Sequence, residues 1–167
     1  VDVSVLLAAG VGRIDVVRKP VVGIIPTGDE MISFEEASGG ADGPEYGRIV
    51  ETNSRMFEGL VRENGGEARR YGIVPDSPEL LEQALLRAAD ECDMVIINAG
   101  SSAGRDDYAV HVIRSIGEVL THGVDIKPGK PVILGKVKER PVIGLPGYPV
   151  SAWLTFMEFA VPVMNRF

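Results

Sequence analysis

The stretch Val21-Val22-Gly23-Ile24-Ile25 runs through Pro26 directly into Thr27-Gly28-Asp29-Glu30. A continuous apolar run rich in β-branched residues is typical of a strand that is buried on both faces of a parallel sheet. In open α/β sheets, the loops that bind ligands gather at the carboxyl ends of such strands. The sequence therefore predicts a buried parallel strand that delivers a glycine-containing, acidic turn to a ligand site.

Two further apolar runs end on glycine-rich turns. Met94-Val95-Ile96-Ile97 leads into the segment 98–107, and Val142-Ile143-Gly144-Leu145 leads into the segment 146–151. Small residues at strand ends let backbone N–H groups approach a phosphate closely. We therefore expect the three turns to belong to one site.

The remaining patterns predict an α/β domain. We expect helices over Ile49–Asn64, after the capping stretch Asp76-Ser77-Pro78-Glu79, over Tyr108–Ile116 and over Ser151–Met164; further strands over Ala68–Val74 and Glu118–Thr121; and a hairpin formed by Val132–Val137 and Val142–Leu145. The hairpin makes the expected sheet mixed. Pro162 is expected to kink or end the last helix, in which Trp153 is expected to be a core residue.

Two segments fit the domain less well. Ser33–Gly47 contains several glycines and few apolar residues, which predicts a mobile loop. Val1–Arg18 contains a helix-like and a strand-like stretch that precede the first buried strand, and Val5–Ala9 is expected to be a short buried helix. This head of the chain is expected to come from a neighbouring domain.

Composition limits the classes of function. A chain of 167 residues fits one domain, and its formal charge of −7 argues against a nucleic-acid partner. No apolar stretch approaches the roughly 20 residues that span a bilayer, so no membrane partner is expected. The single cysteine, Cys92, excludes an internal disulfide and agrees with a reducing, cytoplasmic location.

Acidic residues follow the expected strands. Asp29 and Glu30, then Asp76, then Asp106 and Asp107 lie at three strand ends. Mg²⁺ prefers oxygen ligands and is held by one or two carboxylates together with substrate phosphates, so these residues predict a magnesium site. The alternative for Asp29 and Asp76 is a turn or helix-cap role.

Other residues point to anion binding. Ser101, Ser102 and Gly104 precede a helix and would cradle a phosphate, although a tight turn is the simpler interpretation. Lys127 and Lys130 flank Pro128-Gly129 on a turn suited to an oxyanion, with a solvated surface turn as the alternative.

Several common sites are disfavoured. The chain has neither the dinucleotide-type glycine fingerprint nor the lysine-serine pair of a P-loop. Ser101 is not in the nucleophile elbow of a serine hydrolase. His111 and His122 lack partners at metal-ligand spacing, so structural roles are expected for both.

The order of the motifs resembles molybdopterin-cofactor biosynthesis domains, in particular the molybdopterin molybdotransferases of the MoeA and gephyrin-E-domain type. The matching elements are Thr27-Gly28-Asp29-Glu30, Thr52-Asn53, the segment 100–108, Lys127-Pro128-Gly129-Lys130-Pro131 and Gly144-Leu145-Pro146-Gly147. The resemblance covers residues 20–167, and residues 1–19 are similar to the segment that enters from the family's preceding domain. It implies a three-layer α/β/α sandwich with a mostly parallel, mixed sheet, as in MoaB- and MogA-like domains.

The resemblance also implies an activity. Members of this family bind adenylylated molybdopterin with Mg²⁺, insert molybdate or tungstate and release AMP. By position, the implied catalytic and Mg²⁺-binding acids are Glu30, Asp76 and Asp107; the implied oxyanion-binding residues are Lys127 and Lys130; and the implied substrate-binding residues are Thr27, Gly28, Asp29, Gly100, Ser101, Ser102, Gly104, Asp106, Pro146, Gly147, Pro149 and Ser151.

The chain departs from the family's usual motifs at several positions, and two alternative functions stay open. The family usually has Asn where this chain has Tyr148, Asp where it has Glu51, and Gly where it has Ala99. Because the family builds its site from several domains and a dimer partner, we expect the full-length protein to be a homo-oligomer and this domain to be incomplete alone. The alternatives are an adenylyltransferase of the MogA type, which shares the fold, and a non-catalytic scaffold that binds a pterin nucleotide.

Overall fold

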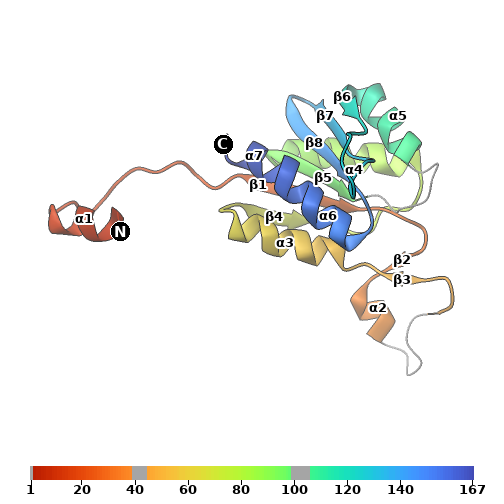
Figure 1. Cartoon of the computed structure of the whole chain (residues 1–167), viewed down its shortest axis with the longest axis horizontal. Helices are drawn as coiled ribbons and strands as arrows, with labels where there is room; N and C mark the ends of the chain where they lie inside the picture. Colours follow the sequence, from red (N-terminus) through yellow and green to blue (C-terminus); the bar gives the residue numbers. More distant parts are fainter. Residues whose placement is uncertain (1, 39–44, 99–105) are drawn as a thin grey trace.

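The computed structural model describes residues 2–38, 45–98 and 106–167, with the side chains of residues 106 and 107 outside the description (Figure 1). The described residues form a six-stranded sheet in the order β4-β1-β5-β8-β7-β6. Its strands are β1 (Val21–Pro26), β4 (Glu67–Arg70), β5 (Met94–Asn98), β6 (Gly117–His122), β7 (Ile133–Val137) and β8 (Arg140–Leu145). β4, β1, β5 and β8 are parallel, and β7 is antiparallel to both of its neighbours. The expected mostly parallel, mixed sheet is confirmed.

Helices cover both faces of the sheet. One face packs against α4 (Pro78–Glu91) and α5 (Asp106–Ile116), and the other against α3 (Asn53–Glu63), α6 (Pro149–Thr155), the π-helical turn η1 (Phe156–Ala160) and α7 (Val161–Met164). Each face carries its own hydrophobic cluster. The three-layer α/β/α sandwich is therefore confirmed.

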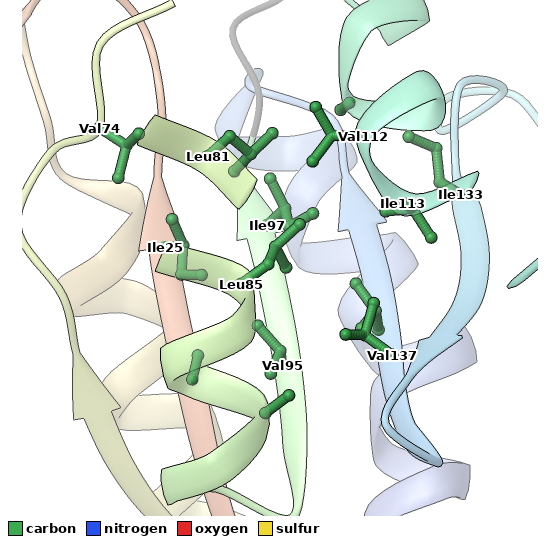
Figure 2. Packing of buried hydrophobic residues seen from close by; sticks show 14 of the residues in the cluster. Ile25, Val74, Leu81, Leu85, Val95, Ile97, Val112, Ile113, Ile133 and Val137 are labelled. Atoms are coloured by element: carbon green, nitrogen blue, oxygen red, sulfur yellow. The ribbon is translucent and has the colours of Figure 1, made fainter. Parts of the chain in front are cut away.

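Strand alternation explains the two clusters. Along β1, Val22 and Ile24 point toward α3 and the C-terminal helices, whereas Ile25 points toward α4. Figure 2 shows the α4 side, where Leu85 lies beside Ile97 of β5. A strand that is buried on both faces needs apolar residues at every position, which is what the run at β1 supplies.

The segment after β1 differs from the expected loop. Ser33–Gly47 was predicted to be a mobile loop, but α2 (Phe34–Ser38) forms within it. A capping box stabilises the start of this helix. The Ser33 N–H and hydroxyl donate to Glu36 Oε2 at 2.8 and 2.9 Å, and the Glu36 N–H donates to Ser33 Oγ at 3.1 Å. The expected helix over Ile49–Asn64 begins only at Asn53, because β3 (Ile49–Val50) pairs with β2 (Met31–Ile32).

Three expectations near the other strands and the C-terminus need correction. The strand expected over Ala68–Val74 ends at Arg70, after which Val74 forms an isolated bridge to Thr27. Pro162 does not end the last helix; a π-helical turn precedes it and α7 continues through it. Proline lacks an N–H and clashes with the preceding turn, which a local widening of the helix accommodates. Trp153 is not a core residue, since 45 % of it is exposed.

The head of the chain projects from the sandwich (Figure 1). α1 (Asp2–Ala8) contains no buried residue, so the expectation of a buried helix here was wrong. The helix forms as predicted, but its apolar side chains contact too little of the chain to be covered. Residues 11–20 carry no helix or strand, which corrects the strand-like expectation. None of the helices in the described part of the chain has the length and apolar character that crossing a bilayer requires.

An ion pair between the exposed Arg18 side chain and the buried Asp93 carboxylate fixes the point where the head meets the sheet. The Arg18 guanidinium donates two hydrogen bonds of 2.5 Å to the Asp93 carboxylate, which also accepts the Val21 N–H at 2.8 Å. Arg140 lies 3.6 Å from the same carboxylate. Asp93 is only 6 % exposed, and the Arg18 hydrogen bonds hold its pKa at about 2, below its ordinary value.

This pair predicts a specific acid sensitivity. Because the pKa of Asp93 is lowered on folding, its stabilising contribution is complete above the unfolded pKa near 4 and disappears as the pH falls toward 2. We expect Asp93→Asn to lower the free energy of unfolding by about 2 kcal/mol at pH 7, and the difference from wild type to shrink toward zero near pH 2. Urea unfolding across that range measures it.

Asp90→Asn is the matched control, since Asp90 is 63 % exposed and pairs with Lys138 at 2.7 Å on the surface. Exposed pairs contribute roughly 0–1 kcal/mol. A loss at Asp93 no larger than at Asp90, or one that does not change with pH, would contradict the assignment.

Candidate functional site

The predicted site turns lie at the same edge of the sheet. Because β1, β4, β5 and β8 are parallel, their carboxyl ends point to one edge. β7 runs the opposite way and starts there, with Ile133 opposite Gly144, so the loop 123–132 reaches the edge as well. We call this the carboxyl edge; it is formed by residues 27–30, 72–77, 98, 123–132 and 146–151.

The buried amide of Asn98 connects these turns. Its Nδ2 donates to the Pro146 carbonyl at 2.8 Å and lies 3.4 Å from the Leu145 carbonyl, so the end of β5 is tied to the turn after β8. Its backbone carbonyl accepts the Thr27 N–H at 2.9 Å and the Thr27 hydroxyl at 3.4 Å. One residue thus fixes the ends of β1, β5 and β8.

Asn53 completes the network from the start of α3. Its Nδ2 donates to Asn98 Oδ1 at 2.9 Å and to the Gly147 carbonyl at 2.6 Å. Glu51 holds this helix start, because its carboxylate accepts the Ser54 N–H at 2.8 Å and the Ser54 hydroxyl at 2.5 Å. The candidate list from the sequence omitted Asn53 and Asn98, although both stand within quoted motifs. The available signal for Asn98 was its position as a polar residue at the end of an apolar run.

The turn after β1 differs from a simple phosphate cradle. The Thr27 N–H donates to Asn98, and the Gly28 N–H donates to the Val74 carbonyl at 3.1 Å, so both amides are already used within the sheet. Gly28 has φ +136°, and a Cβ there would lie 2.8 Å from Glu30 Oε2. The glycine therefore leaves room for the Glu30 carboxylate to fold back over the turn.

Two of the predicted acids lie together. The Asp76 N–H donates to Asp29 Oδ1 at 3.0 Å, and the Tyr108 hydroxyl lies 3.4 Å from Asp76 Oδ1. Asp29 thus has the turn role that the sequence left open, while it remains exposed to solvent. Within the described side chains, no group of three or more acids, histidines or cysteines has the geometry of a metal site. The Asp107 carboxylate lies outside that description, so the predicted Mg²⁺ ligands stay a prediction.

The Lys127–Lys130 loop lies against α6. Gly129 has φ +117°, and a Cβ there would overlap Thr155 Cγ2. Buried Thr155 in turn donates its hydroxyl hydrogen to the Ser151 carbonyl at 2.7 Å. This contact places the exposed lysines, Lys127 and Lys130, beside the helix that follows β8. Their predicted oxyanion role is compatible with that position.

The turn after β8 leads directly into this helix. Pro146 and Gly147 supply the carbonyls that the two asparagines hold, and α6 starts at Pro149, two residues before the start expected from the sequence. Tyr148, between them, is 65 % exposed at the rim of the carboxyl edge. Ser151 belongs to the first turn of α6 and is half-buried.

The residues predicted to cradle a phosphate belong to the segment between β5 and α5. Gly100, Ser101, Ser102 and Gly104 lie outside the described residues, and the backbones of Asp106 and Asp107 form the start of α5. β5 ends at Asn98 and α5 starts at Asp106, so this segment joins two elements that meet at the carboxyl edge.

Comparison with protein families gives one match over most of the chain. The family described as "Probable molybdopterin binding domain" matches residues 23–166. That span begins within β1 and ends after α7, so it contains the whole sandwich and all the turns of the carboxyl edge.

Individual relatives agree with this family. A molybdopterin biosynthesis protein of Methanocaldococcus jannaschii is 40 % identical over 82 % of this chain and 35 % of its own length. A molybdopterin molybdenumtransferase of Nostoc is 31 % identical over 99 % of this chain and 37 % of its own length. The crystal structure of a molybdopterin biosynthesis MoeA protein from Pyrococcus horikosii superposes with a TM-score of 0.83 and 35 % identity, over 98 % of this chain and 39 % of that one. The chain thus spans somewhat more than a third of these relatives.

The amide network predicts a large stability cost at one residue. We expect Asn53→Ala to lower the free energy of unfolding by about 2 kcal/mol, because it leaves Asn98 Oδ1 and the Gly147 carbonyl without their donor in a buried place. Chemical denaturation of both proteins measures this difference.

Asn64→Ala on the same helix is the control. Asn64 also donates to a carbonyl, that of Leu60 at 2.8 Å, but it does so at the partly exposed C-terminus of α3. Equal losses at the two positions would show that the network adds nothing beyond a single ordinary hydrogen bond.

Proposed function

The chain belongs to the molybdopterin-binding domain family, and from this we propose that it is the ligand-binding domain of a molybdopterin molybdotransferase in molybdenum cofactor biosynthesis. In the proposed reaction it binds adenylylated molybdopterin with Mg²⁺, molybdate or tungstate is inserted, and AMP is released. The observation that carries the proposal is the meeting of four described turns at the carboxyl edge, where Asn53 and Asn98 tie the ends of β1, β5 and β8 to the start of α3. Ligands of open α/β sheets bind at such an edge.

The acids fit a Mg²⁺-bound phosphate better than a phosphate alone. Asp29 and Asp76 are adjoining residues at this edge, and Glu30 folds over Gly28 beside them. Carboxylates repel phosphate but are the ligands that Mg²⁺ prefers. We assign Glu30, Asp76 and Asp107 as the residues that would hold the ion, which when bound would neutralise phosphate charge during cleavage of the adenylyl bond.

The chain's own groups would position the substrates. Pro146 and Gly147 form the turn that the asparagines fix, and Pro149 and Ser151 follow it in the first turn of α6. This segment can therefore present a preorganised surface to the pterin nucleotide. Lys127 and Lys130 supply exposed ammonium groups on a loop packed against α6, next to this turn. They would hold the incoming oxyanion, which the otherwise acidic chain repels.

The complete activity belongs to a longer protein. The molybdopterin molybdenumtransferase relatives are more than twice the length of this chain. We therefore propose that residues 1–19 are the segment that enters from a preceding domain, and that turnover needs further domains and a partner copy in a cytoplasmic homo-oligomer. The exposed apolar residues of α1 support this, since a neighbouring domain would cover them.

Mg²⁺ dependence of binding tests the proposed acid site. We expect the 167-residue chain to bind AMP at least tenfold more tightly with Mg²⁺ than in EDTA, because the carboxylates otherwise repel the phosphate. Isothermal titration calorimetry under both conditions measures the two affinities. Glu30→Gln is expected to reduce the Mg²⁺ effect.

Glu63→Gln serves as the control. Glu63 is exposed in the last turn of α3, so this substitution removes the same charge as Glu30→Gln does, but away from the carboxyl edge. Equal AMP affinity in EDTA and in Mg²⁺ would rule out the proposed metal bridge.

Lys127 is the residue that we propose to contact the oxyanion. In the full-length protein, Lys127→Ala is expected to raise the molybdate concentration needed for half-maximal metal insertion by about tenfold, while AMP affinity changes little. The reason is that a compact ammonium group on a fixed loop contacts the oxyanion and not the nucleotide. Metal insertion is measured against molybdate concentration, and AMP binding is measured separately.

Lys138→Ala is the matched control, since Lys138 lies in the β7–β8 turn and pairs with Asp90 on the surface. Lys127 is not the oxyanion contact if its variant keeps the wild-type molybdate dependence or loses AMP affinity by the same factor.

A further inference from the structure

A cleft of about 350 Å³ lies between α4 and α5, outside the turns described above. It is lined by Pro78, Glu79 and Glu82 of α4 and by Tyr108, His111, Val112 and Ser115 of α5. All of these side chains belong to the described part of the chain. Because both helices start at the carboxyl edge, the cleft begins beside the proposed site.

One residue joins the cleft to that site. The Tyr108 hydroxyl lies 3.4 Å from Asp76 Oδ1, and the Asp76 N–H donates to Asp29. A ligand whose phosphate binds at these acids through Mg²⁺ therefore has the cleft within reach of its other end.

The walls of the cleft suit a flat ring with hydrogen-bond donors on its edge. Residues three apart share a helix face, which places Tyr108 and His111 on one wall and Glu79 and Glu82 on the other. Pro78 and Val112 add apolar surface. Aromatic and apolar walls favour a planar heterocycle, and the carboxylates accept hydrogen bonds but donate none.

The two carboxylates have different roles. Glu79 accepts a hydrogen bond from the Ser77 hydroxyl at 2.8 Å, and its own backbone N–H together with that hydroxyl lowers its pKa, so it acts in the helix cap. Glu82 is half-buried and forms no hydrogen bond or ion pair with another described residue. Both oxygens of Glu82 are therefore available to a ligand.

We infer that this cleft is the subsite for the pterin ring, with the Glu82 carboxylate accepting hydrogen bonds from the ring's 2-amino group and N3–H. These two donors stand side by side on the pterin edge, so they match the two oxygens of one carboxylate. Adenine presents a donor next to an acceptor and does not match. The inference rests on the proposed function and adds to it the orientation of the substrate, with the pterin between α4 and α5 and the phosphates at the carboxyl edge.

Fluorescence titration of the 167-residue chain with 6-hydroxymethylpterin tests this assignment. Glu82→Gln is expected to weaken pterin binding at least tenfold and to leave Mg²⁺-AMP binding unchanged, because an amide offers one acceptor where the carboxylate offers two. Lumazine, which carries an oxygen in place of the 2-amino group, is expected to bind wild type at least tenfold more weakly than the pterin and to be insensitive to the substitution.

Two more variants separate the subsite from general effects. Ser115→Phe, which fills the cleft from α5, is expected to weaken pterin binding as Glu82→Gln does. Asp90→Asn removes the same charge from the exposed far end of α4 and is expected to bind pterin as wild type does.

The inference is overturned if Glu82→Gln binds the pterin as tightly as wild type does, if lumazine binds as well as the pterin, or if wild type binds no pterin. In each case, retained Mg²⁺-AMP binding would leave the proposed function standing without this subsite. Loss of both pterin and Mg²⁺-AMP binding in wild type would contradict the proposed function itself.

Discussion

The carboxyl edge of the sheet depends on one buried carboxamide. Asn98 receives a hydrogen bond from Asn53, donates one to Pro146 and accepts the Thr27 N–H through its carbonyl. These contacts join the start of α3 to the ends of β1, β5 and β8, which are far apart in the sequence. In the described part of the chain, no buried side-chain polar atom lacks a partner. Because a buried polar group is costly without its partner, the network specifies one arrangement of these turns.

The two edges of the sheet have different physical characters. At the amino edge, Asp93 is buried against Arg18, and this ion pair fixes where the head of the chain joins the domain. At the carboxyl edge, the acids Asp29 and Asp76 remain near solvent, while neutral amides hold the backbone. The ion pair at the amino edge serves attachment, whereas the acids near solvent at the carboxyl edge suit the cation-bound phosphate that we propose as the ligand.

The sequence was most informative where a local pattern had a single solution. The run at β1 needed burial on both faces, and Ser77-Pro78 could start a helix, so both elements were predicted correctly. Contacts between distant parts of the chain were harder to predict from the sequence. Ile49 has helical spacing but joins a strand pair. The apolar residues of α1 follow a helical pattern, but no described part of the chain buries them. Among candidate site residues, the turn positions followed from strand ends, but the Asn53–Asn98 contact joins residues 45 apart, which no local pattern reveals.

The proposed function requires the ligand to bind at the carboxyl edge of the preorganised sheet. Hydrogen–deuterium exchange of the chain with and without Mg²⁺-AMP tests it most directly, because slowed exchange maps where the ligand covers or stabilises backbone. We expect protection in peptides covering 27–31, 72–77 and 145–151, with no change at 62–67 or at the Arg18–Asp93 pair. Protection confined to the amino edge, with unchanged exchange in the carboxyl-edge turns, would contradict it.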